Sequence, residues 1–297
     1  MELVATAVGL LLTVTLALTV FANAMRVEKE DLLFFVHDQR LLLISLLSIF
    51  VLAPVVAISV IEWIDIPLVI RVAIATMSIS IIPPLLPWKQ LEASGNRHYG
   101  IGLTLIVAVL TIGFVPLQAD LLGRVSHHPY GIPAWEIARY VLAVVLVPTI
   151  LGTLVGARFK GFARRVAVPL AHFAGLGMLA ASAIVLVVSL RDFPHVLSVH
   201  AVLAMVLFNL GALGVGHLLG GPQRDRAVVL AVSSASRHPA LALAIAAVNF
   251  PGEKYTAAVM LCVIVNMMVT APYLRWQAGK VAASLASAGR ASEPGGA

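Results

Sequence analysis

The feature that most constrains this chain is a series of apolar runs, each about 20 residues long, that recur along its whole length. A helix of about 20 residues crosses the roughly 30 Å hydrocarbon core of a bilayer. Hydrophobic residues make up 60% of the chain and charged residues only 11%, whereas soluble domains carry about 25% charged residues. Such a chain cannot cover a water-facing surface, so we expect an all-α integral membrane protein.

Cutting the apolar runs at clusters of charge, glycine and proline predicts nine membrane spans within one transmembrane domain over residues 1–280. The spans lie near residues 3–25, 39–61, 66–88, 99–121, 136–157, 166–190, 197–220, 226–249 and 255–275. The first span resembles a cleavable signal, but it lacks the basic start and exceeds the usual core of about 7 to 15 residues, so we expect it to be retained. Residues 281–297 are rich in alanine, serine and glycine and are predicted to form a disordered cytoplasmic tail.

Lysine and arginine divide unequally between the two sets of loops that alternate along these spans. Fourteen of the 20 lie in one set, five lie in the other, and Arg237 alone lies within a span. Because cytoplasmic loops retain positive charge, the richer set is expected to face the cytoplasm. This predicts a multi-pass protein of the inner cell membrane with its N-terminus outside and its C-terminus in the cytoplasm.

Charge and motif content argue against several other classes of protein. The pI of about 9.8 indicates nucleic acid only where basic residues gather on one face, and here they are spread over short loops. Cys262, the single cysteine, lies in an apolar run and supports neither a disulfide framework nor a cysteine metal site. Phosphate-binding loops, nucleophile elbows and His-Glu-x-x-His motifs are absent. We therefore expect no nucleic-acid partner, no catalytic residue and no metal ligand.

Two spans are interrupted by proline at matching places in the two halves of the chain. The third span contains Pro83, Pro84 and Pro87, and the eighth contains Pro239; each is the next-to-last span of its half. Proline frees backbone groups from the helical ladder, and irregular backbone at membrane depth persists only when it packs inside protein or lines a wet cavity. One such break alone favours a simple kink, but a matched pair is typical of transporter binding sites.

Charged residues accompany the second break. Arg237 lies near the middle of the eighth span, where arginine costs about 2.5–3.5 kcal/mol even on the milder insertion scales, so its guanidinium must face a partner or water. There it can hold a carboxylate, sulfonate or phosphate, or it can brace carbonyls freed in the third span, and both interpretations stay open. His238 beside it can change charge between about pH 5 and 8.

Three further polar residues lie in or next to apolar spans. Asn209 and Asn266 are able to bind a cation or a substrate, although hydrogen bonding between helices is the commoner use of asparagine. Lys89 follows the first break and either reaches a cavity or snorkels to the interface, and snorkelling is favoured. The candidate substrate-binding residues are Arg237, His238, Ser233, Ser236, Pro83, Pro84 and Asn266.

These same regions carry a resemblance to the bile acid:sodium symporter family. The chain is similar to that family over nearly its whole length, from the first span to Trp276. The resembling segments are the first cytoplasmic loop (26–32, followed by 40–42), the segment 92–96 after the first break, residues 239–244 of the eighth span, and Asn266 in the ninth.

The resemblance implies two inverted repeats, in which a panel of helices flanks a core whose two broken helices cross near the bilayer midplane. It also implies alternating access and sodium-coupled uptake of organic anions such as bile acids, steroid sulfates or small carboxylates. The cation-site motifs depart from the family's pattern, because Ser233 and Arg237 stand where sodium-coupled members carry a glutamate and a glutamine, and His238 replaces an asparagine. A fixed positive charge repels sodium at close range.

The predicted function is therefore secondary transport of organic anions, with Arg237 as the anion anchor. No cofactor is expected; sodium remains a conceivable coupling ion, and proton coupling through His238 and facilitated exchange are alternatives to it. The expected partners are a small organic anion and the lipid bilayer, and the protein is expected to be a monomer or homodimer. A membrane-embedded lipid-modifying enzyme and a non-transporting sensor or subunit stay open as other classes.

Overall fold

A computed structural model describes residues 2–83, 86–126, 133–250 and 255–291, and every regular element in these ranges is helical. The elements are α1 (Glu2–Ala24), α2 (Lys29–His37), α3 (Gln39–Leu47), the π-helix η1 (Ser48–Leu52), α4 (Ala53–Trp63), α5 (Leu68–Ser78), α6 (Leu86–Glu92), α7 (Arg97–Ser126), α8 (Ala134–Val141), the π-helix η2 (Leu142–Leu146), α9 (Val147–Arg158), α10 (Lys160–Ser189), α11 (Phe193–Val196), α12 (Val199–Leu219), α13 (Arg224–Ala235), α14 (Pro239–Asn249) and α15 (Tyr255–Ala291).

Within the described residues, the long apolar helices lie where the sequence predicts spans. Seven stretches are long and apolar enough to cross a membrane: Gln39–Trp63, Arg97–Arg124, Trp135–Arg158, Lys160–Ser189, Val199–Leu219, Arg224–Ala246 and Tyr255–Lys280. Two shorter apolar helices, Gly9–Ala24 and Leu68–Ser78, lie at the predicted first and third spans. The prediction of an all-α membrane protein is confirmed.

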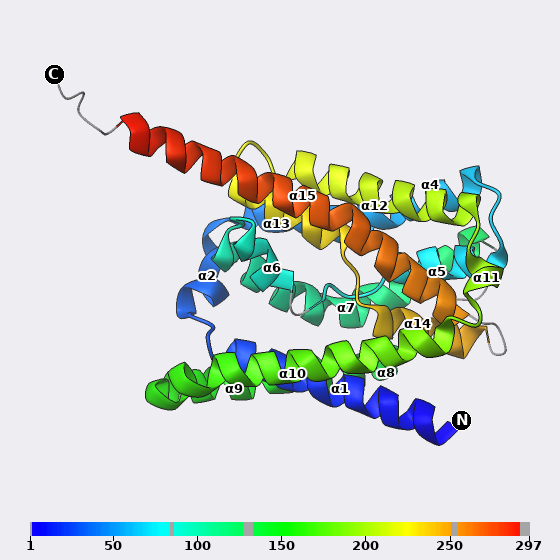
Figure 1. Ribbon diagram of the computed structural model, residues 1–297, viewed down its shortest axis with the longest axis horizontal. Coiled ribbons are helices and arrows are strands. Elements are labelled where there is room, and N and C mark those ends of the chain that lie inside the picture. The colour runs from blue at the N-terminus through cyan, green and yellow to red at the C-terminus, as the bar shows by residue number, and fades with distance from the viewer. Residues whose placement is uncertain (1, 84–85, 127–132, 251–254, 292–297) are drawn as a thin grey trace.

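The helices form two groups that face each other (Figure 1). We call α1, α8–η2–α9 and α10 the panel, because α1 packs along both α9 and α10. The remaining spans form the core, in which α12 packs on α4, α13 and α15, and α5 packs on α14 and α15. In Figure 1 the panel runs along the lower edge in blue and green, and the core lies above it.

Small residues set the close packing inside each group. In the panel, a Cβ at Gly152 would overlap the carbonyl oxygen of Phe21 in α1, and one at Gly156 would overlap that of Met25, the residue after α1. Only glycine permits this approach, and small residues four apart are the usual means by which membrane helices come close, because lipid chains supply no hydrophobic drive between them. The α1–α9 contact therefore depends on the absence of these two side chains.

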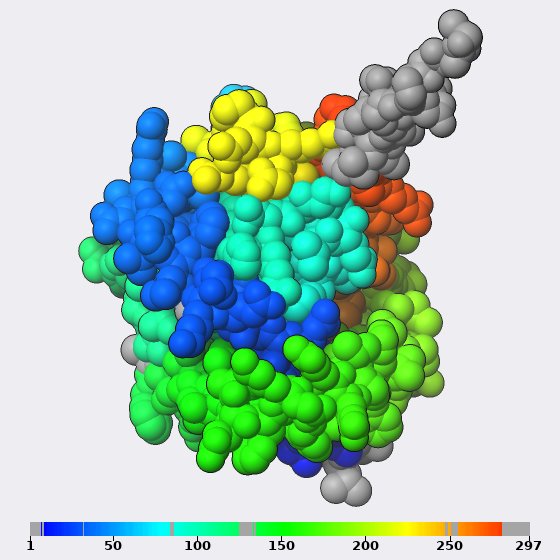
Figure 2. All heavy atoms as spheres, turned by 90° about the vertical axis from the view of Figure 1, so that its left-hand side faces the viewer, coloured from blue at the N-terminus to red at the C-terminus, as the bar shows by residue number. Residues whose placement is uncertain are grey.

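Helix α2 connects the panel to the core and lies against α7. Asp31 of α2 is fully buried and contacts Nδ1 of His98 at 2.6 Å. The Cζ atom of Arg26, two residues after α1, lies 4.0 Å from the ring centre of Trp88 on α6. Burial and the neighbouring Arg97 lower the pKa of Arg26. Figure 2 shows this end of the molecule, with α6 of the core (cyan) facing the α9–α10 hairpin of the panel (green).

The last helix extends further than the sequence predicts. The structure continues α15 to Ala291, past the point at Val281 where a disordered tail is expected to begin. Five of the eleven residues from Val281 to Ala291 are alanine, which has the highest helix propensity, so the helix continues beyond the last apolar turn. The final residues of the expected tail, 292–297, lie outside the described residues.

Candidate functional site

The two predicted breaks are present, and the structure brings them together. In the third span α5 ends at Ser78 and α6 begins at Leu86, and in the eighth α13 ends at Ala235 and α14 begins at Pro239. The segments contact each other through the backbone, because the N–H of His238 donates to the carbonyl oxygen of Ile81 at 2.8 Å. A backbone donor freed in one break is thus satisfied by a carbonyl freed in the other, as burial away from water requires.

Arg237 lies at this crossing and is only 4% exposed. Its Nη2 donates to the carbonyl oxygen of Ile49 at 2.9 Å, whereas its Nε is buried and has no hydrogen-bond partner. Among the described residues no carboxylate lies within ion-pair distance of the guanidinium. The positive charge is therefore held in place, and no described residue neutralises it.

The carbonyl that holds Arg237 belongs to the second span, not to the third span that the brace interpretation named. The reason lies in Pro54, which has no N–H to donate. In the π-helix η1 the N–H of Ala53 donates to Ser48 instead, so the carbonyls of Ile49 and Phe50 lack their helical donors. Arg237 donates to the first of these carbonyls, and Nε2 of Gln118 donates to the second at 2.5 Å.

His238 caps the second half of the broken eighth span. Its Nδ1 accepts a hydrogen bond from the N–H of Ala240 at 3.3 Å, as an N-cap residue does at the start of a helix. A ring nitrogen that accepts carries no proton, so the neutral ring assigned by this bond has its proton on Nε2. Protonating Nδ1 would therefore break the cap of α14.

Asn209 and Asn266 bond to each other, which confirms the expectation of hydrogen bonding between helices. Nδ2 of Asn266 donates to Oδ1 of Asn209 at 2.6 Å and to the carbonyl of Ala235, the last residue of α13, at 3.0 Å. Asn209 also donates, because its Nδ2 bonds to the carbonyl of Met205 at 2.7 Å. Both amide hydrogens of Asn266 are thus engaged, and its remaining polar atom is an acceptor.

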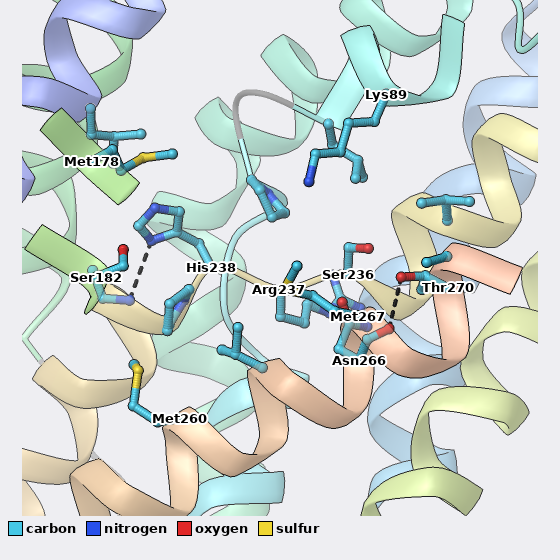
Figure 3. A pocket seen from close by; sticks show the side chains of 18 of the residues that line it. Lys89, Met178, Ser182, Ser236, Arg237, His238, Met260, Asn266, Met267 and Thr270 are labelled. Atoms are coloured by element: carbon cyan, nitrogen blue, oxygen red, sulfur yellow. Dashed lines mark hydrogen bonds between the residues drawn. The ribbon is translucent and has the colours of Figure 1, made fainter. Parts of the chain in front are cut away.

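A cavity of about 800 Å³ lies between the panel and the core at the crossing (Figure 3). Leu12 and Thr13 of α1 and Met178 and Ser182 of α10 line its panel side. Its core side carries Pro83, Ser236, Arg237, His238, Asn266 and Thr270. The walls are mostly apolar with a few polar groups, which is the usual character of a small-molecule site.

The candidate residues from the sequence fall into three groups in the structure. Pro83, Ser236, Arg237, His238 and Asn266 all line the cavity. Ser233 does not: it is fully buried behind the crossing, where its Oγ accepts from Nε2 of Gln90 at 2.8 Å. Pro84 lies outside the described residues.

Several residues that line the cavity were not singled out by sequence reasoning, or were placed elsewhere. Lys89, for which snorkelling to the interface was favoured, lines the cavity (Figure 3). Thr270 lies one helical turn after Asn266 and donates to its carbonyl at 2.7 Å, so the spacing of four residues could have indicated it. Thr13 and Ser182 lie in apolar runs without any such signal, because panel residues reach the site only through tertiary packing.

The comparison with protein families agrees with this architecture. The model of the sodium bile acid symporter family matches residues 13–195, which is well over half of the 297 residues. The match includes the first break, the second half of α1 and the other two panel spans, and it ends before the second break, so Arg237 lies beyond it. A search of curated proteins finds no match. On the extent of the family match, the chain belongs to the sodium bile acid symporter family, whose members are transporters.

Proposed function

We propose that this protein is a secondary transporter of organic anions and that the anion binds at the crossing of the two broken spans. The single observation that carries the proposal is the guanidinium of Arg237, which lines the cavity while its Nε has no partner and no described carboxylate pairs with it. A buried charge without a partner is strongly unfavourable. An anion that enters and leaves would neutralise it for part of each cycle.

The surroundings of Arg237 favour an anion that also carries an apolar body. The N-terminus of α14 lies at the cavity, where Pro239 and Ala240 line it, and the N-terminal end of a helix favours negative charge. Met178, Met260 and Met267 contribute flexible apolar surface. A substrate whose carboxylate, sulfonate or sulfate binds Arg237, and whose apolar part lies between the panel and the core, would match both the positive groups and the methionines.

Asn266 adds a preference for a hydrogen-bond donor on the substrate. Both of its amide hydrogens are taken by Asn209 and Ala235, so only its Oδ1 is left to interact in the cavity. An oxygen acceptor there pairs with a hydroxyl or amino group of the substrate. We therefore expect anions that carry such a donor to be taken up in preference to analogues without it.

The mechanism that follows from these groups is facilitative alternating access, without sodium or proton coupling at the crossing. The fixed charge of Arg237 opposes a mobile cation at close range, and the acceptor role of His238 Nδ1 in the α14 cap opposes its use as a proton carrier. The cavity extends to Glu92 on α6 and Arg275 on α15. With the N-terminus outside and the C-terminus in the cytoplasm, as the loop charges indicate, that is the inward-facing direction.

The proposal is tested by uptake of radiolabelled organic anions into proteoliposomes. We expect Arg237→Ala to lower uptake at subsaturating anion concentrations by a factor of roughly 10 to 150, because one charge-assisted interaction of a buried group contributes about 1.5–3 kcal/mol. Arg71→Ala is the matched control, since Arg71 also donates to a backbone carbonyl, that of Ile66 at 3.1 Å, and does not line the cavity.

A thermal-shift screen of the purified protein identifies the anion and the coupling in one experiment. Stabilisation by an organic anion should be equal in sodium and in potassium and should be lost in Arg237→Ala. Unchanged uptake by Arg237→Ala, with Arg71→Ala behaving as wild type, would refute the anchor role.

A further inference from the structure

The guanidinium of Arg237 lies against a backbone carbonyl oxygen, and the residue follows the C-terminal end of a helix. The carbonyl oxygen of Ile49, left without a helical donor by Pro54, accepts from Nη2 at 2.9 Å. Helix α13 ends at Ala235, two residues before Arg237, so the negative end of a helix of 12 residues lies next to it. The one described carboxylate that lines the cavity, that of Glu92, makes no ion pair with Arg237.

A carbonyl without its helical donor and the C-terminal end of a helix together favour a positive charge. Unwound backbone carbonyls and the C-terminal ends of half-helices are the groups that hold mobile cations in transporters with broken spans. Here that place is occupied by a side chain that is part of the protein. A second, independent observation is that Nε of Arg237 has no hydrogen-bond partner although the residue is only 4% exposed. The described residues therefore leave part of the guanidinium available to a ligand.

We propose that Arg237 is the built-in cation of this transport site, so that removal of its guanidinium leaves a vacant site that accepts a mobile monovalent cation. The guanidinium takes the place of a co-transported cation. It neutralises the anion in the middle of the membrane, and it remains bound to the protein when the anion leaves. This inference rests on the proposed function, because it assigns the cation in the same site that binds the anion.

Two measurable properties follow. First, uptake by the wild-type protein needs no cation and carries the charge of the substrate alone, so a monoanion accumulates roughly tenfold for each 60 mV or so of inside-positive potential. Second, a variant that lacks the guanidinium, such as Arg237→Gly, loses uptake and regains it when free guanidinium ions fill the vacant site.

The experiment uses proteoliposomes that contain the full-length chain, and millimolar guanidinium chloride as the probe. Urea is the matched negative probe, because it has nearly the same planar shape and no charge. Arg71→Gly is the control variant, and we expect neither probe to alter its uptake. Arg237→Lys retains a tethered charge, so we expect it to keep cation-independent, potential-driven uptake at a reduced rate. Thermal unfolding and size-exclusion profiles verify that each variant is folded.

Restoration of Arg237→Gly by guanidinium but not by urea, together with cation-independent uptake by wild type, supports the inference. Restoration by sodium or potassium also supports it, since the vacated site then holds a mobile ion. A sodium requirement in the wild-type protein overturns it. Failure of every cation to restore a folded, inactive Arg237→Gly overturns the built-in cation and leaves the anion anchor standing. Full uptake by Arg237→Gly without any added cation overturns both.

Discussion

Replacing Asn209 by leucine removes the hydrogen bond between α12 and α15, and its effect on stability and uptake measures what that bond contributes. Asn209 is 1% exposed, accepts from Nδ2 of Asn266 and donates to the carbonyl of Met205 four residues earlier. Asn249→Leu is the matched control, because Nδ2 of Asn249 makes the same kind of bond to the carbonyl of Ile245 at 2.8 Å and no hydrogen bond to Asn266. Both changes remove a local bond, and only the first removes the bond between helices.

The difference between the two variants estimates the contribution of that link. Hydrogen bonds between helices in membrane proteins contribute about 0.6 kcal/mol on average and about 1.7 kcal/mol at most. We therefore expect the free energy of unfolding of Asn209→Leu to be lower than that of Asn249→Leu by about 0.6–1.7 kcal/mol. Because the amide of Asn266 is then fixed only by Ala235, the KM for a hydroxylated anion should rise by roughly 3- to 20-fold.

The measurements are reversible unfolding in detergent or lipid and proteoliposome uptake of two anions that differ by one hydroxyl group. The KM of the anion without the hydroxyl should rise less, because it makes no bond to Oδ1 of Asn266. Equal stabilities and equal KM values for Asn209→Leu and Asn249→Leu would show that the asparagine pair orients nothing and would refute the reasoning.

Three further predictions follow from the structure. Gly156→Leu should prevent stable folding, because its side chain would meet the backbone of Met25 at the end of the first span. Gly175→Leu should be tolerated, because a Cβ at Gly175 has no neighbouring atom within 4 Å; expression and size-exclusion profiles decide this. Introduced in a background without the native cysteine, His195→Cys should react with an impermeant thiol reagent on intact cells and Lys160→Cys should not, and the reverse result would invert the orientation. His238→Asn should keep the α14 cap and the pH profile of uptake, whereas His238→Leu should lower the free energy of unfolding by about 1 kcal/mol; a flattened pH profile in His238→Asn would contradict the cap role.

The spans, the two breaks and the need of Arg237 for a polar partner could all be predicted from the sequence, because each is a property of a short stretch of chain. Twenty apolar residues in a row cross hydrocarbon wherever they occur. A proline removes its own donor whatever surrounds it, and an arginine at mid-depth needs a polar partner in any fold. The positions of the broken helices and the all-helical class therefore agree with the prediction.

Only the tertiary structure decided which groups these residues meet. The carbonyl that holds Arg237 is that of Ile49, 188 positions earlier, and it is available because Pro54 leaves it without a donor. The same packing turns Ser233 away from the cavity and brings Ser182 of the panel to it. The local sequence shows that a group needs a partner. Which partner it meets depends on how distant helices pack, and packing is a property of the whole chain.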